Sequence, residues 1–308
     1  MKHYTAEQIK AAVRLEHLLE PVARSLVEYS AGRAVSSIAH LEWGQNEVHV
    51  KNGHLLGGHL FVVKVATSFP GHAPMPLNGV QMVFDALTGE PAALLQDGGY
   101  LTDLRTAAAG AAAARALAPE GIRTVGILGT GTQGRLQPLA LSLVRKFERL
   151  LVWGRNPGKA QALADHLRGE LEGVEVDAVS SVQSVVEQSD LLITATSSRE
   201  PLVRAEWLRP GMHITALGGD GLGKVELETA VLAKAKVFVD SAEANLVRGE
   251  VELASRQGLL DGLKLPEIGK VISGEIAGRT GPHDLTVAKL VGLGVQDLAA
   301  VETALGRL

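Results

Sequence analysis

Hydrophobic residues recur at helical spacing at the start of the chain. Within residues 1–30 the apolar positions fall three or four apart, and Pro21 interrupts the stripe. Thr5 is a suitable N-cap, and Glu7 stands in the first turn, where a negative charge complements the helix dipole. The pattern predicts helix over this segment.

The period changes to that of strands from about residue 35 to residue 95. Strands are predicted over residues 60–67 and 79–85, with prolines in the loop between them. The pair Asn52-Gly53 predicts a hairpin turn, because these residues accept the positive φ of a type I′ turn.

An alanine-rich stretch occupies residues 101–118. Alanine is the best helix former, so a buried helix is predicted here. Pro119 ends this stretch and marks a predicted domain boundary.

Short apolar strands and helix-length segments alternate after residue 123, which indicates a doubly wound parallel sheet. Residues 285–308 return to a helical pattern and are expected to pack back on the first domain. The predicted fold class is α/β: a Rossmann-type domain over 119–284 and an α+β domain over 1–118 with 285–308. The predicted strands of the Rossmann-type domain are 124–128, 150–153, 174–178, 191–196, 213–217 and 237–240.

Composition excludes several classes of protein. The chain has 308 residues and no Cys, which excludes disulfide scaffolds, Cys-based zinc sites and thiol catalysis. Its 30 Lys and Arg against 34 Asp and Glu give a net charge of −4 without a basic block, so no nucleic-acid partner is expected. No signal peptide and no membrane-length apolar run are found, so a cytoplasmic protein without membrane contact is predicted.

A G-x-G-x-x-G motif lies between a predicted strand and a predicted helix. Gly129 makes the tight turn, Gly131 admits a pyrophosphate to the backbone, and Gly134 permits close helix–strand packing. This context predicts dinucleotide binding. The candidate cofactor-binding residues of this loop are Gly129, Thr130, Gly131, Thr132, Gln133 and Gly134.

The residues after the second strand of that domain bear on the choice of dinucleotide. NAD sites usually carry Asp or Glu there, to bind the ribose 2′-hydroxyl. This chain has Arg155 and Asn156 instead, and an arginine suits a 2′-phosphate. NADP(H) is therefore favoured, with NAD(H) left open. Thr196, at the end of a later predicted strand, completes the candidate cofactor-binding residues.

Three charged residues are candidates for chemistry. Lys64 lies in a strand that is apolar on both faces, where a charged amine is costly unless it is paired or its pKa falls. Arg105 opposes the dipole at the start of the alanine-rich helix, which suggests a nearby anion, although a local pair with Asp103 would also explain it. Asp220 follows a predicted strand and is either a proton-exchanging group or a turn residue.

Histidines give no sign of a metal centre. His49, His54 and His59 recur at odd spacing, which alternates faces of a strand, and no H-E-x-x-H is present. No metal is therefore predicted.

Taken together, these residues resemble the ornithine cyclodeaminase/μ-crystallin family over nearly the whole chain. The most specific segment is Leu-Thr-Asp-Leu-Arg-Thr-Ala-Ala at residues 101–108, similar to the family's L-T-x-x-R-T-A-A signature. Lys64, the glycine loop, the segment 220–227 and the segment 286–297 are also similar to family landmarks.

The resemblance implies a homodimer that acts on a small amino or imino acid. It implies that Lys64 and Arg105 bind the substrate α-carboxylate and that Asp220 is the acid/base near the substrate nitrogen. Met82 stands where the cyclodeaminases have Thr, and a further substrate-binding arginine is expected near residues 33–40, which makes Arg33 a candidate.

Three functions remain open at this point. The favoured one is an NAD(P)-dependent oxidoreductase acting at the Cα–N bond of a small α-amino or α-imino acid, such as a ketimine or pyrroline-2-carboxylate reductase or an amino-acid dehydrogenase. The alternatives are an ornithine cyclodeaminase, which forms proline and ammonia without net redox change, and a non-catalytic NADP-binding protein of the crystallin kind. The identity of the substrate side chain is not readable from the sequence.

Overall fold

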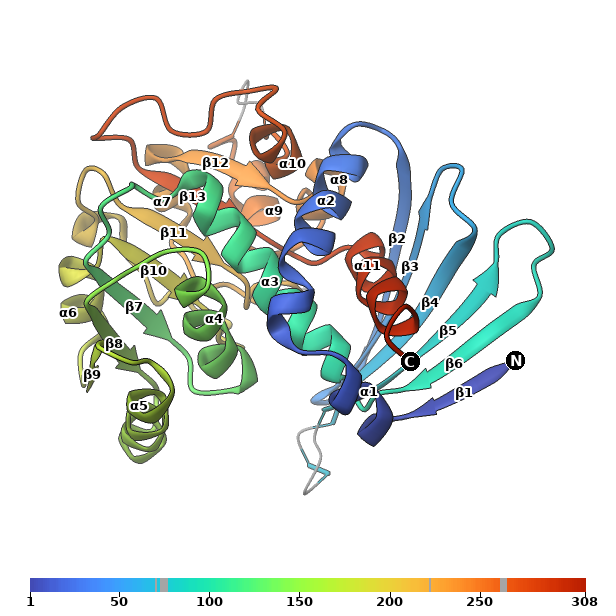
Figure 1. Cartoon of the computed structure of the whole chain (residues 1–308). Coiled ribbons are helices and arrows are strands. Elements are labelled where there is room, and N and C mark those ends of the chain that lie inside the picture. Colours follow the sequence, from blue (N-terminus) through green and yellow to red (C-terminus); the bar gives the residue numbers. More distant parts are fainter. Residues whose placement is uncertain (70, 73–76, 222, 261–264) are drawn as a thin grey trace. The chain divides into compact units, whose positions relative to one another are not determined.

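The computed structural model describes the chain except residues 70, 73–76, 222 and 261–264, and it divides the chain into two units (Figure 1). The first comprises Met1–Ala109 with Gly292–Leu308, and the second comprises Gly110–Val291. These boundaries differ from the predicted ones at 118 and 284. Helix α3 (Tyr100–Leu117) runs unbroken through the first boundary, and strand β13 (Thr286–Lys289) pairs in the second sheet.

The described residues of the first unit form a six-stranded sheet in the order β1-β6-β5-β4-β3-β2. Strand β1 is parallel to β6, and the other neighbours are antiparallel. The strands are β1 (Lys2–Thr5), β2 (Ala34–Trp43), β3 (Asn46–Leu55), β4 (Leu60–Ser68), β5 (Leu77–Asp85) and β6 (Pro91–Gln96).

Helices cover one face of this sheet. Helix α11 (Gly294–Leu305) packs on β2, β3 and β4, and α2 (Leu19–Ser30) packs on α11 and β2 (Figure 1). Because side chains alternate along a strand, the opposite face carries a separate set of residues. That face keeps exposed apolar side chains, namely Val35, Leu41, Trp43 and Met82.

The predicted hairpin turn at Asn52-Gly53 is wrong. Both residues lie inside β3, paired with β2 and β4, and the turn between β2 and β3 lies at Gly44, whose φ is +61°. A glycine is needed at position 53 for a different reason. A Cβ there would lie 2.3 Å from the carbonyl carbon of Gly294, so Gly53 allows the start of α11 to approach the sheet.

The helical prediction for residues 1–30 holds only in part. The segment divides into β1, α1 (Ala6–Ala12), the 3-10 helix η1 (Leu15–His17) and α2. Thr5 caps α1, and its side chain accepts from the backbone N–H of Gln8, as its sequence position predicted. The N-terminal residues became a strand because they pair with β6, a tertiary contact that local pattern does not encode.

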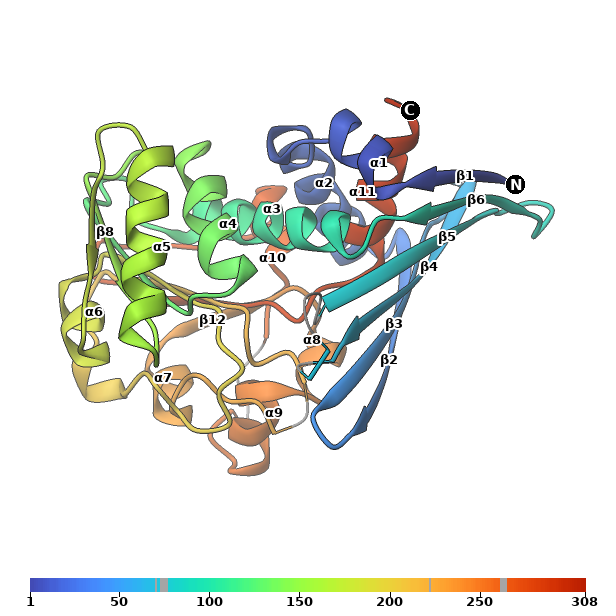
Figure 2. The same cartoon turned by 90° about the horizontal axis from the view of Figure 1, so that it is seen from below.

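The second unit contains a parallel sheet in the order β12-β13-β11-β10-β7-β8-β9. Helix α4 (Thr132–Ser142) lies on one face, and α7 (Thr229–Lys234) and α9 (Gly249–Arg256) lie on the other (Figure 2). This is the predicted Rossmann-type arrangement, and a buried aliphatic cluster fills it. The strands are β7 (Thr124–Leu128), β8 (Arg149–Trp153), β9 (Glu175–Ala178), β10 (Leu191–Thr194), β11 (His213–Ala216), β12 (Lys236–Val239) and β13.

Helices connect these strands and complete the described elements. They are α4 (Thr132–Ser142), α5 (Pro157–Glu170), α6 (Val182–Gln188), the 3-10 helix η2 (Ala205–Trp207), α7 (Thr229–Lys234), α8 (Ala242–Asn245), α9 (Gly249–Arg256) and α10 (Ile268–Ile272). The wholly helical prediction for 285–308 is wrong at β13, whose Thr-Val-Ala-Lys sequence is fully buried between two parallel strands. Among all helices in the described part of the chain, none is long and apolar enough to cross a membrane.

Candidate active site

Three cations of the first unit gather around one buried carboxylate, that of Asp297. Lys64 Nζ lies 2.9 Å from Asp297 Oδ1, and Arg105 Nε donates to the same oxygen at 2.8 Å. Lys51 stands directly opposite Lys64 in the sheet, and its Nζ donates to the carbonyl oxygen of Gly292 at 2.9 Å. All four side chains are almost completely buried.

Burial and repulsion by its neighbours disfavour the charge on Lys64. Burial lowers the pKa of Lys64 to about 7, Asp297 opposes that shift, and Arg105 and Lys51 add to it. Burial alone would raise the pKa of Asp297, but Arg105, Lys64 and Lys51 hold it below its ordinary value. Lys64 and Arg105 thus share one carboxylate, and Lys51 lies near enough to act on it through its charge. Such a concentration of buried cationic groups favours binding of a further anion.

Strand register and one glycine create this arrangement. Lys51 on β3, Lys64 on β4 and Gln81 on β5 form a row across the helix-covered face. Gly292 has a φ of +79°, and a Cβ there would lie 2.6 Å from Arg105 Nη1. The cations can therefore approach the chain just before α11 only because this residue has no side chain.

The structure places two predicted substrate-binding residues outside this row. Arg33 is exposed, and its guanidinium pairs with Glu28 at 2.6 Å. Met82 follows Gln81, so alternation directs it to the face opposite Lys64, where it is 36% exposed. Lys51, and not Arg33, lies beside Lys64 in this row.

Glycines of the second unit shape the loop after β7. Gly129 has a φ of +128°, and a Cβ there would lie 2.4 Å from the carbonyl oxygen of Ala195. A Cβ on Gly134 would lie 2.2 Å from the carbonyl oxygen of Gly129. Gly131, the N-cap residue of α4, has no atom within 4 Å of its Cβ position. The loop is thus closed on the protein side and open at Gly131, which fits the approach of a dinucleotide pyrophosphate.

Local contacts hold the segment after β8. Gly154 packs against Thr130, since a Cβ on Gly154 would lie 2.4 Å from Thr130 Cγ2. The side chain of Asn156 caps α5 by accepting from the N–H of Lys159. Arg155 is exposed between them. Asn156 therefore has a helix-capping role, and both Arg155 and Asn156 are exposed.

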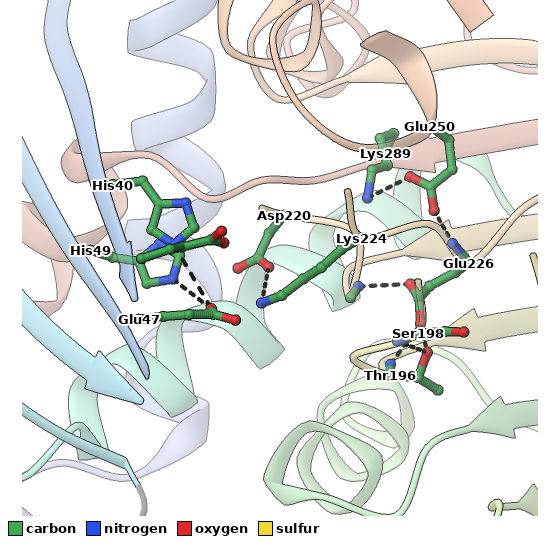
Figure 3. Close-up of polar contacts among 12 residues, drawn as sticks. His40, Glu47, His49, Thr196, Ser198, Asp220, Lys224, Glu226, Glu250 and Lys289 are labelled. Atoms are coloured by element: carbon green, nitrogen blue, oxygen red, sulfur yellow. Dashed lines mark hydrogen bonds and ion pairs between the residues drawn. The ribbon is translucent and has the colours of Figure 1, made fainter. Parts of the chain in front are cut away.

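Glu226 joins the carboxyl ends of β10 and β11. Its buried carboxylate accepts from Thr194 Oγ1 at 2.6 Å, from the N–H and the Oγ1 of Thr196, and from the N–H of Gly218 (Figure 3). Burial and the neighbouring Glu250 raise its pKa. In parallel α/β sheets ligands bind at this edge, so Glu226 fixes the edge where the cofactor is expected and orients Thr196.

A buried ion pair supports Glu226 in turn. Lys289 Nζ, at the end of β13, lies 3.0 Å from Glu250 Oε2, and neither side chain is exposed. The other oxygen of Glu250 accepts from the N–H of Glu226 at 2.6 Å (Figure 3). The ion pair and these hydrogen bonds connect the ends of β10, β11 and β13.

Asp220 lies in the loop after β11 and remains accessible. Its Oδ1 is 3.4 Å from Lys224 Nζ, and its side chain is 33% exposed (Figure 3). A partly exposed carboxylate with a neighbouring cation can exchange protons with a ligand. Asp220 belongs to the second unit, whereas Lys64 and Arg105 belong to the first.

Several residues of these two sites were given no functional role from the sequence. Lys51 carries no distinct signal, because it continues the polar positions 47 and 49 of an alternating strand. Lys289 carries a detectable signal, since it is a lysine within an apolar run. Glu226 and Glu250 carry none, since their burial depends on the packing of loops far apart in the sequence. Asp297 fell within a segment noted for its family resemblance, without a role.

Comparison with protein families gives a match over nearly the whole chain. Residues 2–307 match the model of the ornithine cyclodeaminase/mu-crystallin family. A Delta(1)-pyrroline-2-carboxylate reductase of Bacillus cereus is 33% identical over 303 residues, which are 96% of this chain and 92% of that protein.

Solved structures resemble the chain over its full length. The Thermococcus litoralis Delta(1)-pyrroline-2-carboxylate reductase, in complex with NADH and L-proline, gives a TM-score of 0.92 at 29% identity, covering 100% of this chain and 97% of that one. An archaeal alanine dehydrogenase dimer with bound NAD gives a TM-score of 0.92 at 28% identity, covering 100% and 95%.

Proposed function

The chain belongs to the ornithine cyclodeaminase/mu-crystallin family, and we propose that it transfers a hydride at the Cα–N bond of a small α-amino or α-imino acid. It is an NAD(P)-dependent oxidoreductase of this type. The observation that carries the proposal is the buried group of three cations around a single carboxylate.

Lys64 and Arg105 bind the substrate α-carboxylate in this proposal. Both already donate to Asp297 Oδ1, so their side chains are oriented before substrate arrives. Lys51 adds a third positive charge to the same interior. A substrate carboxylate would interact favourably with this group of cations, which favours binding of the anionic substrate over a neutral analogue.

The glycine loop of residues 129–134 is assigned to the dinucleotide pyrophosphate. The support is the open space at Gly131 and the tight packing behind Gly129 and Gly134. When bound, the dinucleotide supplies or accepts the hydride. Thr196, which is hydrogen-bonded to Glu226, is assigned to the same cofactor site at the carboxyl ends of the strands. Arg155 is assigned to the adenosine end of the dinucleotide. An arginine there suits a 2′-phosphate, so NADP(H) is favoured over NAD(H).

Asp220 is proposed as the proton-exchanging group. In the reductive direction it keeps the substrate nitrogen protonated, which makes the imine carbon electrophilic. In the oxidative direction it accepts the proton of the amine. Its partial exposure permits exchange of that proton with solvent.

Two assays test this function. Incubation with a cyclic ketimine and stoichiometric NADPH should oxidise the cofactor, and Asp220→Asn should lower kcat by about 100-fold or more while cofactor affinity is kept. Incubation with ornithine and catalytic NAD+ covers the cyclodeaminase alternative. Proline and ammonia formed without net cofactor use would replace the reductase by that alternative, and no turnover with any imino acid would favour a binding protein.

A homodimer and a cytoplasmic location stay predictions. The dimer is supported by the exposed apolar face of the first sheet, which carries Leu41 and Trp43 at 58% and 50% exposure. Monomeric proteins rarely expose a contiguous apolar face, because burying it in an interface is favourable.

A further inference from the structure

Four titratable side chains stand together on the β2–β3 hairpin. His40 and Glu42 of β2 lie directly opposite His49 and Glu47 of β3. Since pairing and alternation place directly opposed residues on the same side of a sheet, all four share one face. Figure 3 shows the side chains of His40, His49 and Glu47 next to one another.

Their ligand atoms are close enough for one ion. Glu47 Oε2 lies 3.2 Å from His49 Nε2 and 3.9 Å from His40 Nε2, and Glu42 Oε1 lies 3.5 Å from His40 Nε2. One ligand atom from each of His40, Glu47 and His49 lies within 4.8 Å of the others. Tetrahedral zinc ligands at about 2.0–2.1 Å from the metal lie about 3.3 Å apart, so small side-chain rotations suffice.

Charge and burial also favour a cation here. Like charges directly opposite on neighbouring strands repel, as Glu42 and Glu47 do when both are ionised. The side chains are largely removed from water, with exposures of 6% for His40, 15% for His49 and 15% for Glu47. A divalent ion would neutralise both carboxylates, and neutral imidazoles would complete its coordination.

We propose that His40, Glu47 and His49 bind one divalent transition-metal ion of the zinc type, with Glu42 as the fourth ligand. Two imidazoles with carboxylates suit Zn²⁺, Co²⁺ or Ni²⁺, whereas Mg²⁺ and Ca²⁺ prefer oxygen ligands alone. No metal was predicted from the sequence, because His49, His54 and His59 alternate faces along the chain. Strand pairing instead brings His40 opposite His49. The site does not depend on the proposed reaction.

Zinc binding to the full chain tests the proposal. Protein made without a polyhistidine tag is stripped with a chelator, dialysed against low-micromolar ZnCl₂ and analysed for metal by mass spectrometry. One zinc per chain is expected, and zinc should raise the unfolding temperature. His49→Ala should lower zinc affinity by at least about 100-fold, since even loss of an outer-shell partner costs 10–100-fold.

His166→Ala is the matched control, because His166 and Glu170 form an exposed His–Glu pair on α5 at 4.0 Å. This variant should bind zinc as the wild type does. Retention of one zinc by His49→Ala, or no zinc in the wild type, would overturn the proposal. X-ray absorption on the zinc-loaded wild type needs no variant: two imidazole nitrogens are expected, and a shell of oxygens alone would contradict the site.

Discussion

Lys64 and Asp297 are 233 positions apart in the sequence, and their side chains meet at 2.9 Å in the interior of the first unit. Neither is more than 1% exposed. The carboxylate holds the ammonium in place, while burial lowers the pKa of Lys64 to about 7. This pair connects the sheet to α11 and prepares a cation for an anionic ligand.

The pH dependence of kcat/KM should report the protonation of Lys64. Its pKa in the free protein is about 7, so carboxylate binding weakens as the pH rises through that value and the ammonium loses its proton. A fall in kcat/KM above about pH 7 is expected. In Lys64→Arg the guanidinium stays charged, and this fall should vanish.

Removing the charge of Lys64 should lower kcat/KM more than replacing the lysine by arginine. Lys64→Met is expected to lower kcat/KM by at least about 100-fold, the usual result of truncating a buried hydrogen-bonded charge. Arg33→Gln is the control, since its exposed side chain pairs with Glu28, and it should change kcat/KM by less than about twofold. A large effect of Arg33→Gln would restore Arg33 as a substrate-binding residue.

Asp297→Asn should destabilise the fold at neutral pH. It leaves Lys64 and Arg105 as buried charges without their counter-ion, which costs about 3–5 kcal/mol. Because the cations lower the pKa of Asp297 in the folded state, its contribution is complete above the unfolded value and declines as the pH falls below about 4. Urea unfolding at several pH values measures the difference.

Asp165→Asn, on α5, is the control substitution for Asp297→Asn. Asp165 pairs with Arg168 at 2.6 Å, and both side chains are about half exposed. Its loss should cost less than about 1 kcal/mol. Equal costs for the two substitutions would mean that the buried cations do not depend on Asp297.

Two glycines of the dinucleotide loop should respond differently to alanine. Gly131→Ala meets no atom within 4 Å, so it should fold normally yet weaken cofactor binding about tenfold or more, because the methyl group occupies the space proposed for the pyrophosphate. Gly129→Ala should lower the free energy of unfolding by more than about 1 kcal/mol, because its φ is positive and its Cβ meets Ala195. Fluorescence titration and urea unfolding separate the two effects. Normal cofactor affinity in Gly131→Ala would move the cofactor away from this loop.

Arg155 should determine the preference between the two dinucleotides. The wild type is expected to bind NADPH more tightly than NADH, and Arg155→Leu should weaken NADPH binding while NADH affinity changes little. Lys159→Met, an exposed cation on the following helix, is the control and should leave both affinities unchanged. A clear preference of the wild type for NADH would contradict the role of Arg155.

Leu41→Glu should weaken the proposed homodimer. It places a charge on the exposed apolar face of the first sheet, where burial against a second copy becomes unfavourable. Leu87→Glu is the control, since Leu87 is 94% exposed in a turn between β5 and β6. Analytical ultracentrifugation of the wild type and both variants gives the oligomeric state, and a monomeric wild type would exclude the dimer.

Local sequence determined the elements whose formation needs few distant partners. The strand Thr124–Leu128 was predicted with its observed bounds, because a short apolar run before a glycine turn has little alternative. The alanine-rich helix and the cap at Thr5 were also predicted correctly. For the helix and the cap the deciding interactions lie within a few residues along the chain. The strand pairs with the distant β8 and β10, but the glycine turn after it marks its end in the sequence.

Tertiary structure decided the rest. Asn52-Gly53 is a strand segment and not a turn, because β4 and the start of α11 lie beside it. The gathering of Lys51, Lys64 and Arg105 on Asp297 depends on strand register and on α11, which lies far along the chain from all three cations. Whether a charged side chain is buried, and which group it pairs with, depends on tertiary contacts between residues that are distant in the sequence. Sequence therefore indicated which residues carry charge in costly places, and only the packed structure showed which partner each one has.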